Sequence, residues 1–233
     1  MPGPIIVFDL DGTLVDTAPD LIDTLNVILA AENIPAVAYD DASTMIGGGV
    51  RPMIESALQE QKRELDPDAI DALFARFIAH YQDHIADRSR PFDGVEAALD
   101  VLGRDFVLAV CTNKFEALSV RLLDALGLSG PFAAICGQDT FQMKKPDRGA
   151  LLGTISRAGG DASRAIMVGD SETDIRLARA AGIPVIGVDF GYTRIPMAAL
   201  APDRLIGHFD LLPQAVSELL ADSARNTPGQ IYG

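Results

Sequence analysis

The sequence predicts an α/β fold: a doubly wound parallel sheet of the Rossmann-like type with an inserted all-helical domain. Short apolar runs recur along the chain, and each one ends in small or polar residues. Helical patterns separate the later runs, which is typical of parallel strands joined by crossover helices. A long segment near the N-terminus, residues 17–90, holds helical patterns and no strand-like run.

The expected strands are apolar runs bounded by turn residues. They are Ile5–Phe8, Phe106–Cys111, Phe132–Cys136, Ala165–Val168 and Pro184–Val188. The crossover helices between them each stop at a glycine, the residue that most often follows a helix C-terminus. These helices are expected over Phe115–Leu126, Asp147–Ala158 and Thr173–Ala181.

The inserted segment carries four helical patterns and a glycine break at residues 47–49. The helices are expected over Pro19–Glu32, Asp40–Ile46, Pro52–Lys62 and Pro67–Ala86. We therefore predict a discontinuous catalytic core over residues 1–16 and 91–221, with a helical cap over residues 17–90. The polar residues 222–233, with Pro and Gly, are expected to form a flexible tail.

Composition excludes several classes of protein. The chain has 233 residues, 48% of them apolar, which is typical of a globular protein. A formal charge of −14 argues against a nucleic-acid partner, and the apolar runs are too short to span a membrane. Cys111 and Cys136 lie in apolar surroundings, and the N-terminus has no basic, apolar leader, so we expect a cytoplasmic protein, monomer or homodimer.

Polar side chains cluster where the predicted strands end. Two carboxylates, Asp9 and Asp11, follow the first strand, and further polar groups follow the others. Because ligands of open parallel sheets bind beyond the carboxyl ends of the strands, these side chains are expected to converge on one edge. The later members are Thr112, Asn113, Lys145, Asp170 and Asp174.

Four of these stretches resemble the ordered motifs of the haloacid dehalogenase-like hydrolases. They read DLDGTLVD, CTN, KKPD and GDSETD, each at the end of an expected strand. The insertion point of the helical segment also resembles that of the family's type-1 cap. Within the family, the chain is most similar to the phosphoglycolate phosphatase-type branch. It departs from the family's common Lys-Pro-x-Pro pattern, because Asp147-Arg148 follows Lys145-Pro146.

The carboxylates also indicate a metal ion. Carboxylates crowded together repel one another, and a divalent cation with oxygen ligands relieves that repulsion. Mg²⁺ is the expected cation, and it would supply the positive charge that an acidic protein needs to bind an anionic substrate. Asp9 and Asp170 are expected as direct ligands and Asp174 as a direct or water-mediated one. The family resemblance adds the backbone carbonyl of Asp11.

Chemical roles follow for the residues of the first motif. Asp9 would be the nucleophile, since a carboxylate can attack phosphorus and form an aspartyl-phosphate. Asp11 would protonate the leaving oxygen and later deprotonate the attacking water. Gly12 would let the chain turn away beside the phosphate.

The second and third motifs are expected to bind the phosphoryl group. Thr112 and Asn113 would donate hydrogen bonds to it, although Asn113 is also a candidate helix N-cap. Lys145 would balance charge on the nucleophile and the transferring group. Its neighbour Lys144 is the alternative, but Lys145 directly precedes Pro146, as in the family motif.

The glycine break in the helical segment has two interpretations. It is either a hinge between helices with a solvated arginine, or the cap loop that recognises the substrate. In the second interpretation Gly48 lies near the substrate and Arg51 pairs with a carboxylate, a geometry that suits arginine.

The function expected from these residues is that of a Mg²⁺-dependent phosphatase of small phosphorylated metabolites. The resemblance favours 2-phosphoglycolate as the substrate. A sugar phosphomutase of the same fold is the alternative within enzymes, and a phospho-acceptor signalling module is the alternative from another class. The order of the motifs disfavours the signalling module.

Overall fold

The computed structural model describes residues 2–40 and 44–226, with side chains described up to residue 222. The helix expected over Asp40–Ile46 falls partly on residues 41–43, which lie outside this range. Residues 44–47 form turns instead of a helix. Residues 227–233 of the expected tail also lie outside the described range.

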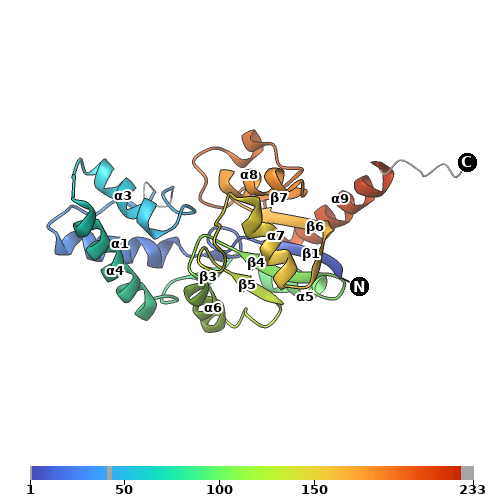
Figure 1. Cartoon of the computed structure of the whole chain (residues 1–233), viewed down its shortest axis with the longest axis horizontal. Helices are drawn as coiled ribbons and strands as arrows, with labels where there is room; N and C mark the ends of the chain where they lie inside the picture. Colours follow the sequence, from blue (N-terminus) through green and yellow to red (C-terminus); the bar gives the residue numbers. More distant parts are fainter. Residues whose placement is uncertain (1, 41–43, 227–233) are drawn as a thin grey trace, which may run out of the picture.

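A parallel sheet of six strands forms the centre of the molecule, in the order β5-β4-β1-β6-β7-β8 (Figure 1). The predicted fold class is confirmed, and every expected strand is present. The strands are β1 (Gly3–Phe8), β4 (Val107–Cys111), β5 (Ala134–Cys136), β6 (Gly160–Gly169), β7 (Val185–Val188) and β8 (Arg204–Ile206). The last of these was not predicted.

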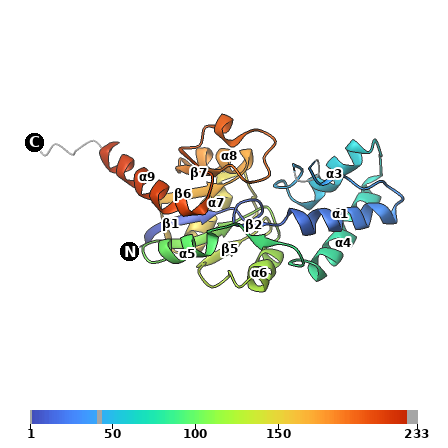
Figure 2. The ribbon, with the colours of Figure 1, turned by 180° about the vertical axis from the view of Figure 1, so that it is seen from behind.

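Helices cover both faces of the sheet, which is why β1 is apolar without alternation. Ile5 and Val7 of β1 pack toward α7 (Arg148–Arg157) and α8 (Glu172–Ala181). Ile6 and Phe8 face the opposite layer. That layer is built from α5 (Val95–Leu102), α6 (Glu116–Ala125) and α9 (Leu212–Asn226), and Figure 2 shows α5 and α9 from this side.

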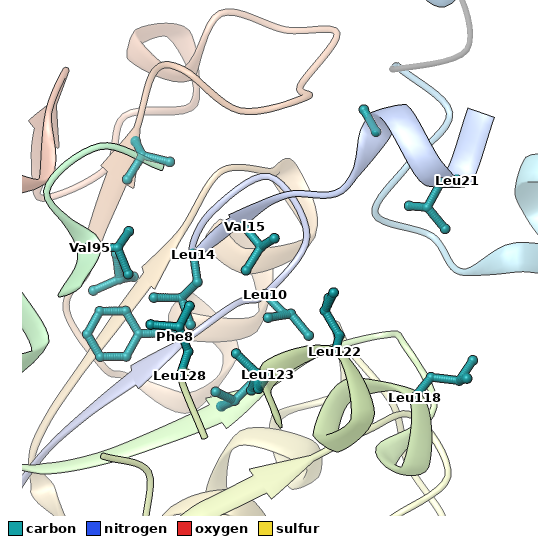
Figure 3. Close-up of a cluster of buried hydrophobic side chains, with 14 of the residues drawn as sticks. Phe8, Leu10, Leu14, Val15, Leu21, Val95, Leu118, Leu122, Leu123 and Leu128 are labelled. Carbon is teal, nitrogen blue, oxygen red and sulfur yellow. The ribbon is translucent and has the colours of Figure 1, made fainter. Parts of the chain in front are cut away.

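The layer on the second face forms a continuous apolar core. Figure 3 shows Phe8, Leu10 and Leu14 gathered with Leu122 and Leu123 of α6, all fully buried. Burying each of these side chains stabilises the fold by about 1.5–3 kcal/mol. This packing fixes the end of β1, from which the polar residues follow.

In the described part of the inserted segment, three helices lie between two short paired strands, away from both termini (Figure 1). The strands β2 (Val15–Asp16) and β3 (Arg90–Pro91) are antiparallel. Between them lie α1 (Ala18–Ala31), α3 (Val50–Glu60) and α4 (Pro67–Asp83), with α1 and α3 both packed on α4. We call these three the inserted helices. The small sheet that joins them to the core was not predicted.

A buried carboxylate ties together the two chain crossings beside this small sheet. Asp20, in the first turn of α1, accepts hydrogen bonds from the backbone N–H groups of Arg88 and Ser89 and from the Ser89 hydroxyl. The start and the end of the inserted segment are therefore held to each other.

The C-terminal part holds two 3₁₀ helices, η1 (Met197–Leu200) and η2 (Phe209–Leu211), before α9. The helix α9 continues to Asn226, so the first residues of the segment expected as a flexible tail are helical. The first turns of α9 pack into the apolar core through Leu212, Val216 and Leu219. Within the described residues, every helix is too short or too polar to cross a bilayer.

Candidate active site

The strand order places β1 between β4 and β6, so the chain winds outward from β1 in both directions. Crevices at the carboxyl ends of strands open at such a reversal. Asp9 directly follows β1, Thr112 follows β4 and Asp170 follows β6. The Asp9 N–H still donates to the Val168 carbonyl (2.9 Å), so the sheet ladder positions Asp9 itself.

Three carboxylates meet at this edge. Oxygens of Asp9, Asp170 and Asp174 all lie within 4.8 Å of one another, and all three side chains are buried. The ammonium of Lys145 lies 2.7 Å from Oδ1 of Asp9 and 2.7 Å from Oδ1 of Asp174. The exposed Lys144 takes no part in this cluster. The structure therefore brings together the residues predicted to bind a metal through their side chains, and it favours Lys145 over Lys144.

The N-terminus of α8 fixes Asp174. Ser171 caps the helix, and Oδ2 of Asp174 accepts hydrogen bonds from the Ser171 hydroxyl (2.6 Å) and backbone N–H (3.2 Å). This reciprocal capping box satisfies two helix-end groups. It leaves Oδ1 of Asp174 facing Lys145 and the other carboxylates.

Asp170 is held by the loops after β1 and β7. Thr13 donates its hydroxyl (3.0 Å) and Tyr192 its backbone N–H (2.8 Å) to the carboxylate. Gly12 has a φ of +83°, and a Cβ there would lie 2.4 Å from Oδ2 of Asp170. Only glycine fits both the backbone conformation and the space at this position.

The three carboxylates are buried and repel one another, and the single ammonium of Lys145 does not offset all of their negative charge. Burial, and then repulsion from Asp174, raises the pKa of Asp170 to about 7. The same two causes, with Asp170 added, raise the pKa of Asp9 well above its usual value despite the nearby Lys145. Burial lowers the pKa of Lys145, but attraction to Asp174 and Asp9 outweighs it, and the net pKa is raised. Three carboxylates thus face one ammonium.

Asp11 lies beside this cluster but its side chain has other partners. One carboxylate oxygen accepts the Thr17 hydroxyl (2.7 Å), and the ammonium of Lys114 lies 2.8 and 3.0 Å from the two oxygens. The side chain of Lys114 is 5% exposed. Among the carboxylates, Asp11 is therefore set apart from the three that face one another.

Thr112 and Asn113 both lie in the pocket that Asp9 and Asp11 line. The Thr112 hydroxyl oxygen accepts the Lys114 backbone N–H (3.2 Å). The Asn113 amide donates to the Gly47 carbonyl (3.1 Å) of the inserted segment, whereas its buried Oδ1 has no hydrogen-bond partner in the described chain. Asn113 thus connects the core to the glycine break.

The structure does not bring Arg51 to this pocket. Arg51, on α3, is half-exposed, with its guanidinium hydrogen-bonded to Asp71 of α4. It lines an adjoining surface hollow together with Phe74, and this hollow shares Gly49, Val50 and Phe115 with the pocket beside Asp9. Gly48 is not among the residues that line the Asp9 pocket, although its neighbours Gly47 and Gly49 are.

Two functional-site residues were missed in the sequence. Lys114 directly follows Asn113, so the strand-end argument could have included it. Tyr81 lies on the inner face of α4, four residues after the buried Phe77, and that spacing was visible. Both side chains line the pocket with Asp9, and the Lys114 ammonium lies 4.9 Å from the centre of the Tyr81 ring.

Comparison with known proteins agrees with the geometry. The family model of the haloacid dehalogenase-like hydrolases matches residues 6–188. The chain is 52% identical to a phosphoglycolate phosphatase of Mesorhizobium japonicum over 225 residues, covering 96% of this chain and 99% of that protein. It is 50% identical to a phosphoglycolate phosphatase of Agrobacterium fabrum, covering 94% of each.

Solved structures show the same architecture. A crystal structure of a predicted phosphoglycolate phosphatase from Haemophilus somnus has a TM-score of 0.85 and 29% identity, covering 91% of this chain and 97% of that one. CbbY from Rhodobacter sphaeroides, solved in complex with phosphate, has a TM-score of 0.76 and 24% identity, covering 91% and 96%. The match of the family model and the identity to these relatives show that the chain belongs to the haloacid dehalogenase-like hydrolases.

Proposed function

We propose that the protein is a Mg²⁺-dependent phosphatase that hydrolyses 2-phosphoglycolate through an aspartyl-phosphate on Asp9. The observation that carries this proposal is the convergence of Asp9, Asp170 and Asp174 around Lys145, with Asp11 alongside. The named activity of relatives at 52% and 50% identity supports the choice of substrate.

The residues present fit a magnesium ion. Mg²⁺ prefers oxygen ligands, and three buried carboxylates face one another with a single ammonium among them. The raised pKa values of Asp9 and Asp170 reflect negative charge that a cation would offset. Asp9, Asp170 and Asp174 would hold the ion, with the backbone carbonyl of Asp11. Bound there, Mg²⁺ would stabilise negative charge on the transferring phosphoryl group.

In the first half-reaction, Asp9 attacks phosphorus. Its Oδ1 accepts hydrogen bonds from Lys145 and from the Leu10 backbone N–H. Its other oxygen, Oδ2, accepts none from the described residues and is the oxygen we expect to attack. The bond between phosphorus and the ester oxygen breaks, and Asp11 gives its proton to the leaving glycolate oxygen.

In the second half-reaction, water hydrolyses the aspartyl-phosphate. Asp11, now ionised, takes a proton from the water as it attacks phosphorus. The bond between Asp9 and phosphorus breaks, phosphate leaves, and both carboxyl groups return to their starting states. Thr17 and Lys114 keep the Asp11 carboxyl group in one orientation beside Asp9.

The remaining predicted residues position the phosphoryl group. The Thr112 hydroxyl accepts a backbone N–H but donates to no described residue, so its hydrogen is available to a phosphoryl oxygen. Lys145 keeps its charge through both steps because two carboxylates flank it. Such fixed donors carry most of the catalysis in phosphoryl transfer.

The inserted helices would act as the cap over this site. Ile46, Val50 and Met53 of the inserted segment line the pocket opposite Asp9. Their apolar side chains exclude bulk water, which strengthens the electrostatic interactions inside. The domain boundaries at residues 16/17 and 90/91 belong to this proposal.

The proposal is tested by a phosphate-release screen over phosphorylated metabolites, with and without Mg²⁺. We expect 2-phosphoglycolate to give the highest kcat/KM and EDTA to abolish the activity. Conversion of a sugar phosphate to its isomer without release of phosphate would instead indicate a phosphomutase. A phospho-Asp9 that persists for minutes with no ester turned over would indicate a signalling module.

A further inference from the structure

The pocket beside Asp9 contains a cation that the steps above use only to hold Asp11. Among the side chains that line this pocket, Lys114 supplies the positive charge, and the others toward the inserted helices are mainly apolar. An ammonium has three N–H donors. The Lys114 ammonium donates to the two carboxylate oxygens of Asp11 and also lies against the Tyr81 side chain, which leaves its third donor facing Tyr81 and the pocket.

A second donor without an acceptor lies next to this ammonium. The Tyr81 side chain is fully buried, and its hydroxyl has no hydrogen-bond partner in the described chain. A buried hydroxyl without a partner is costly and is rare in folded proteins. Tyr81 lines the same pocket as Asp9, and its ring lies under the Lys114 ammonium. The two donors therefore face one small space.

We propose that Lys114 and Tyr81 form a subsite that binds the carboxylate of the substrate, an inference that rests on the proposed phosphatase function. One carboxylate oxygen accepts from the Lys114 ammonium and the other from the Tyr81 hydroxyl. Lys114 lies against Asp11, two residues from Asp9, so the carboxylate must lie close to the phosphoryl group. The substrate class is the phosphate ester of a short hydroxy acid, of which 2-phosphoglycolate is the smallest.

The subsite takes the role that the sequence assigned to Arg51. Arg51 is half-exposed and paired within the inserted helices, whereas Lys114 is buried and faces the nucleophile's pocket. Because Lys114 follows β4 and Tyr81 belongs to α4, one bound carboxylate would join the core to the inserted helices. Substrates that lack the carboxylate would lose both contacts at once.

The test compares 2-phosphoglycolate with ethyl phosphate, the two-carbon ester that lacks the carboxylate. We expect the protein to prefer 2-phosphoglycolate by about 10- to 100-fold in kcat/KM, the range expected for hydrogen bonds to a charged group. In Lys114→Met the preference should fall to a few-fold. Both esters will lose some activity, since Asp11 loses its partner, so the ratio between the esters is the readout.

Tyr81→Phe tests the subsite without disturbing Asp11. Its fold should be retained, because the hydroxyl that is removed has no partner, and a thermal unfolding curve checks this. We expect KM for 2-phosphoglycolate to rise about 2- to 10-fold with kcat little changed, and KM for ethyl phosphate to stay the same. Arg51→Ala is the matched control at the other candidate cation and should leave the ratio unaltered.

Each of three results would contradict the proposed subsite. If kcat/KM fell equally for both esters in Lys114→Met and in Tyr81→Phe, the role of Lys114 would be limited to positioning Asp11. A wild-type protein that hydrolyses ethyl phosphate as well as 2-phosphoglycolate would overturn the subsite and leave the phosphatase standing. A wild-type protein that releases phosphate from neither ester, with Mg²⁺ present, would remove the proposed function and the subsite with it.

Discussion

The core edge and the inserted helices are built on different principles. At the core edge, each polar side chain follows a buried strand, and neighbouring strands set its position: Asp9 by β1 and Asp170 by β6. In the inserted helices, a residue reaches the site only where its side chain enters the pocket beside Asp9, as at Tyr81. Arg51 lines an adjoining surface hollow instead. The positions of the proposed catalytic residues therefore depend on where each strand of the core ends. The shape of the substrate pocket depends on how the inserted helices pack against the core.

This difference predicts whether a substitution changes the chemical step or the binding of the substrate. The core residues are buried and hydrogen-bonded or ion-paired to their neighbours, so we expect a single change there to remove a chemical step. The pocket-facing residues of the inserted helices contribute binding contacts, which change KM and substrate preference. A residue of those helices outside the pocket should change neither. The predictions below test this order.

The largest effect is expected from Asp9→Asn. An amide is a poor nucleophile, so phosphate release should fall by about 10⁴-fold or more. The variant should remain folded, because Lys145 keeps its ion pair with Asp174. Phosphate release and trapping of a phosphoprotein by mass spectrometry give the measurement. Asp71→Asn, an exposed carboxylate of α4, is the control, and a folded Asp9→Asn with normal turnover would contradict the nucleophile's assignment.

Removal of the metal is expected to come next. EDTA should abolish activity, and saturating Mg²⁺ should stabilise the protein by about 2.7 kcal/mol at one hundred times its dissociation constant. Asp170→Asn should lose this stabilisation. Thermal unfolding with and without Mg²⁺ measures it, and an identical melting temperature in both conditions would count against a magnesium site.

The same site should make stability without metal depend on pH. The pKa of Asp170 is about 7 in the folded protein, above its ordinary value of 3.8. The folded state therefore binds more protons than the unfolded state between these values, and stability should fall as pH rises from about 4 to 7. Melting curves in EDTA across this range test the sign. Asp170→Asn should flatten the curve, and a wild-type curve that rises instead would refute the raised pKa.

Much of this core edge could be predicted from the sequence, for a physical reason. Continuous apolar runs such as Ile5–Phe8 form buried strands. The residues that directly follow parallel strands lie at the same edge of the sheet, so the motif residues were expected to lie close together. Lys145 was distinguishable from Lys144 by its place before Pro146. The strand order depends on packing between residues far apart in the sequence, and so does the pairing of β2 with β3. Local sequence patterns do not predict either of them.

The substrate pocket could not be predicted to the same degree. A helical pattern shows which face of α4 is apolar, but not that the buried Tyr81 ring would lie under the ammonium of Lys114, the partner of Asp11. Arg51 looked suitable because it follows a glycine break and carries charge. Its guanidinium instead pairs with Asp71 one helix away, a contact set by the docking of α3 on α4. Surface charges of this kind usually satisfy one another.

Asp11→Asn should give an intermediate effect that depends on the leaving group. An alkyl ester leaves as a strong base and needs a proton, whereas p-nitrophenolate leaves without one. We expect a loss of about 10²- to 10⁴-fold for 2-phosphoglycolate and a much smaller loss for p-nitrophenyl phosphate. The ratio of kcat values for the two esters is the measurement. Equal losses would assign Asp11 to positioning alone.

The smallest effect is expected at Arg51, and it separates residues of the inserted helices that line the pocket from one that does not. Arg51→Ala removes an exposed ion pair with Asp71 and leaves the pocket lining intact. The kcat/KM for 2-phosphoglycolate should stay within about twofold of wild type, since exposed pairs contribute little. Tyr81→Phe, on the inner side, is the matched comparison. A larger selective loss at Arg51 than at Tyr81 would mean that Arg51 contacts the substrate when it binds, and the docking seen here would then describe only the unliganded state.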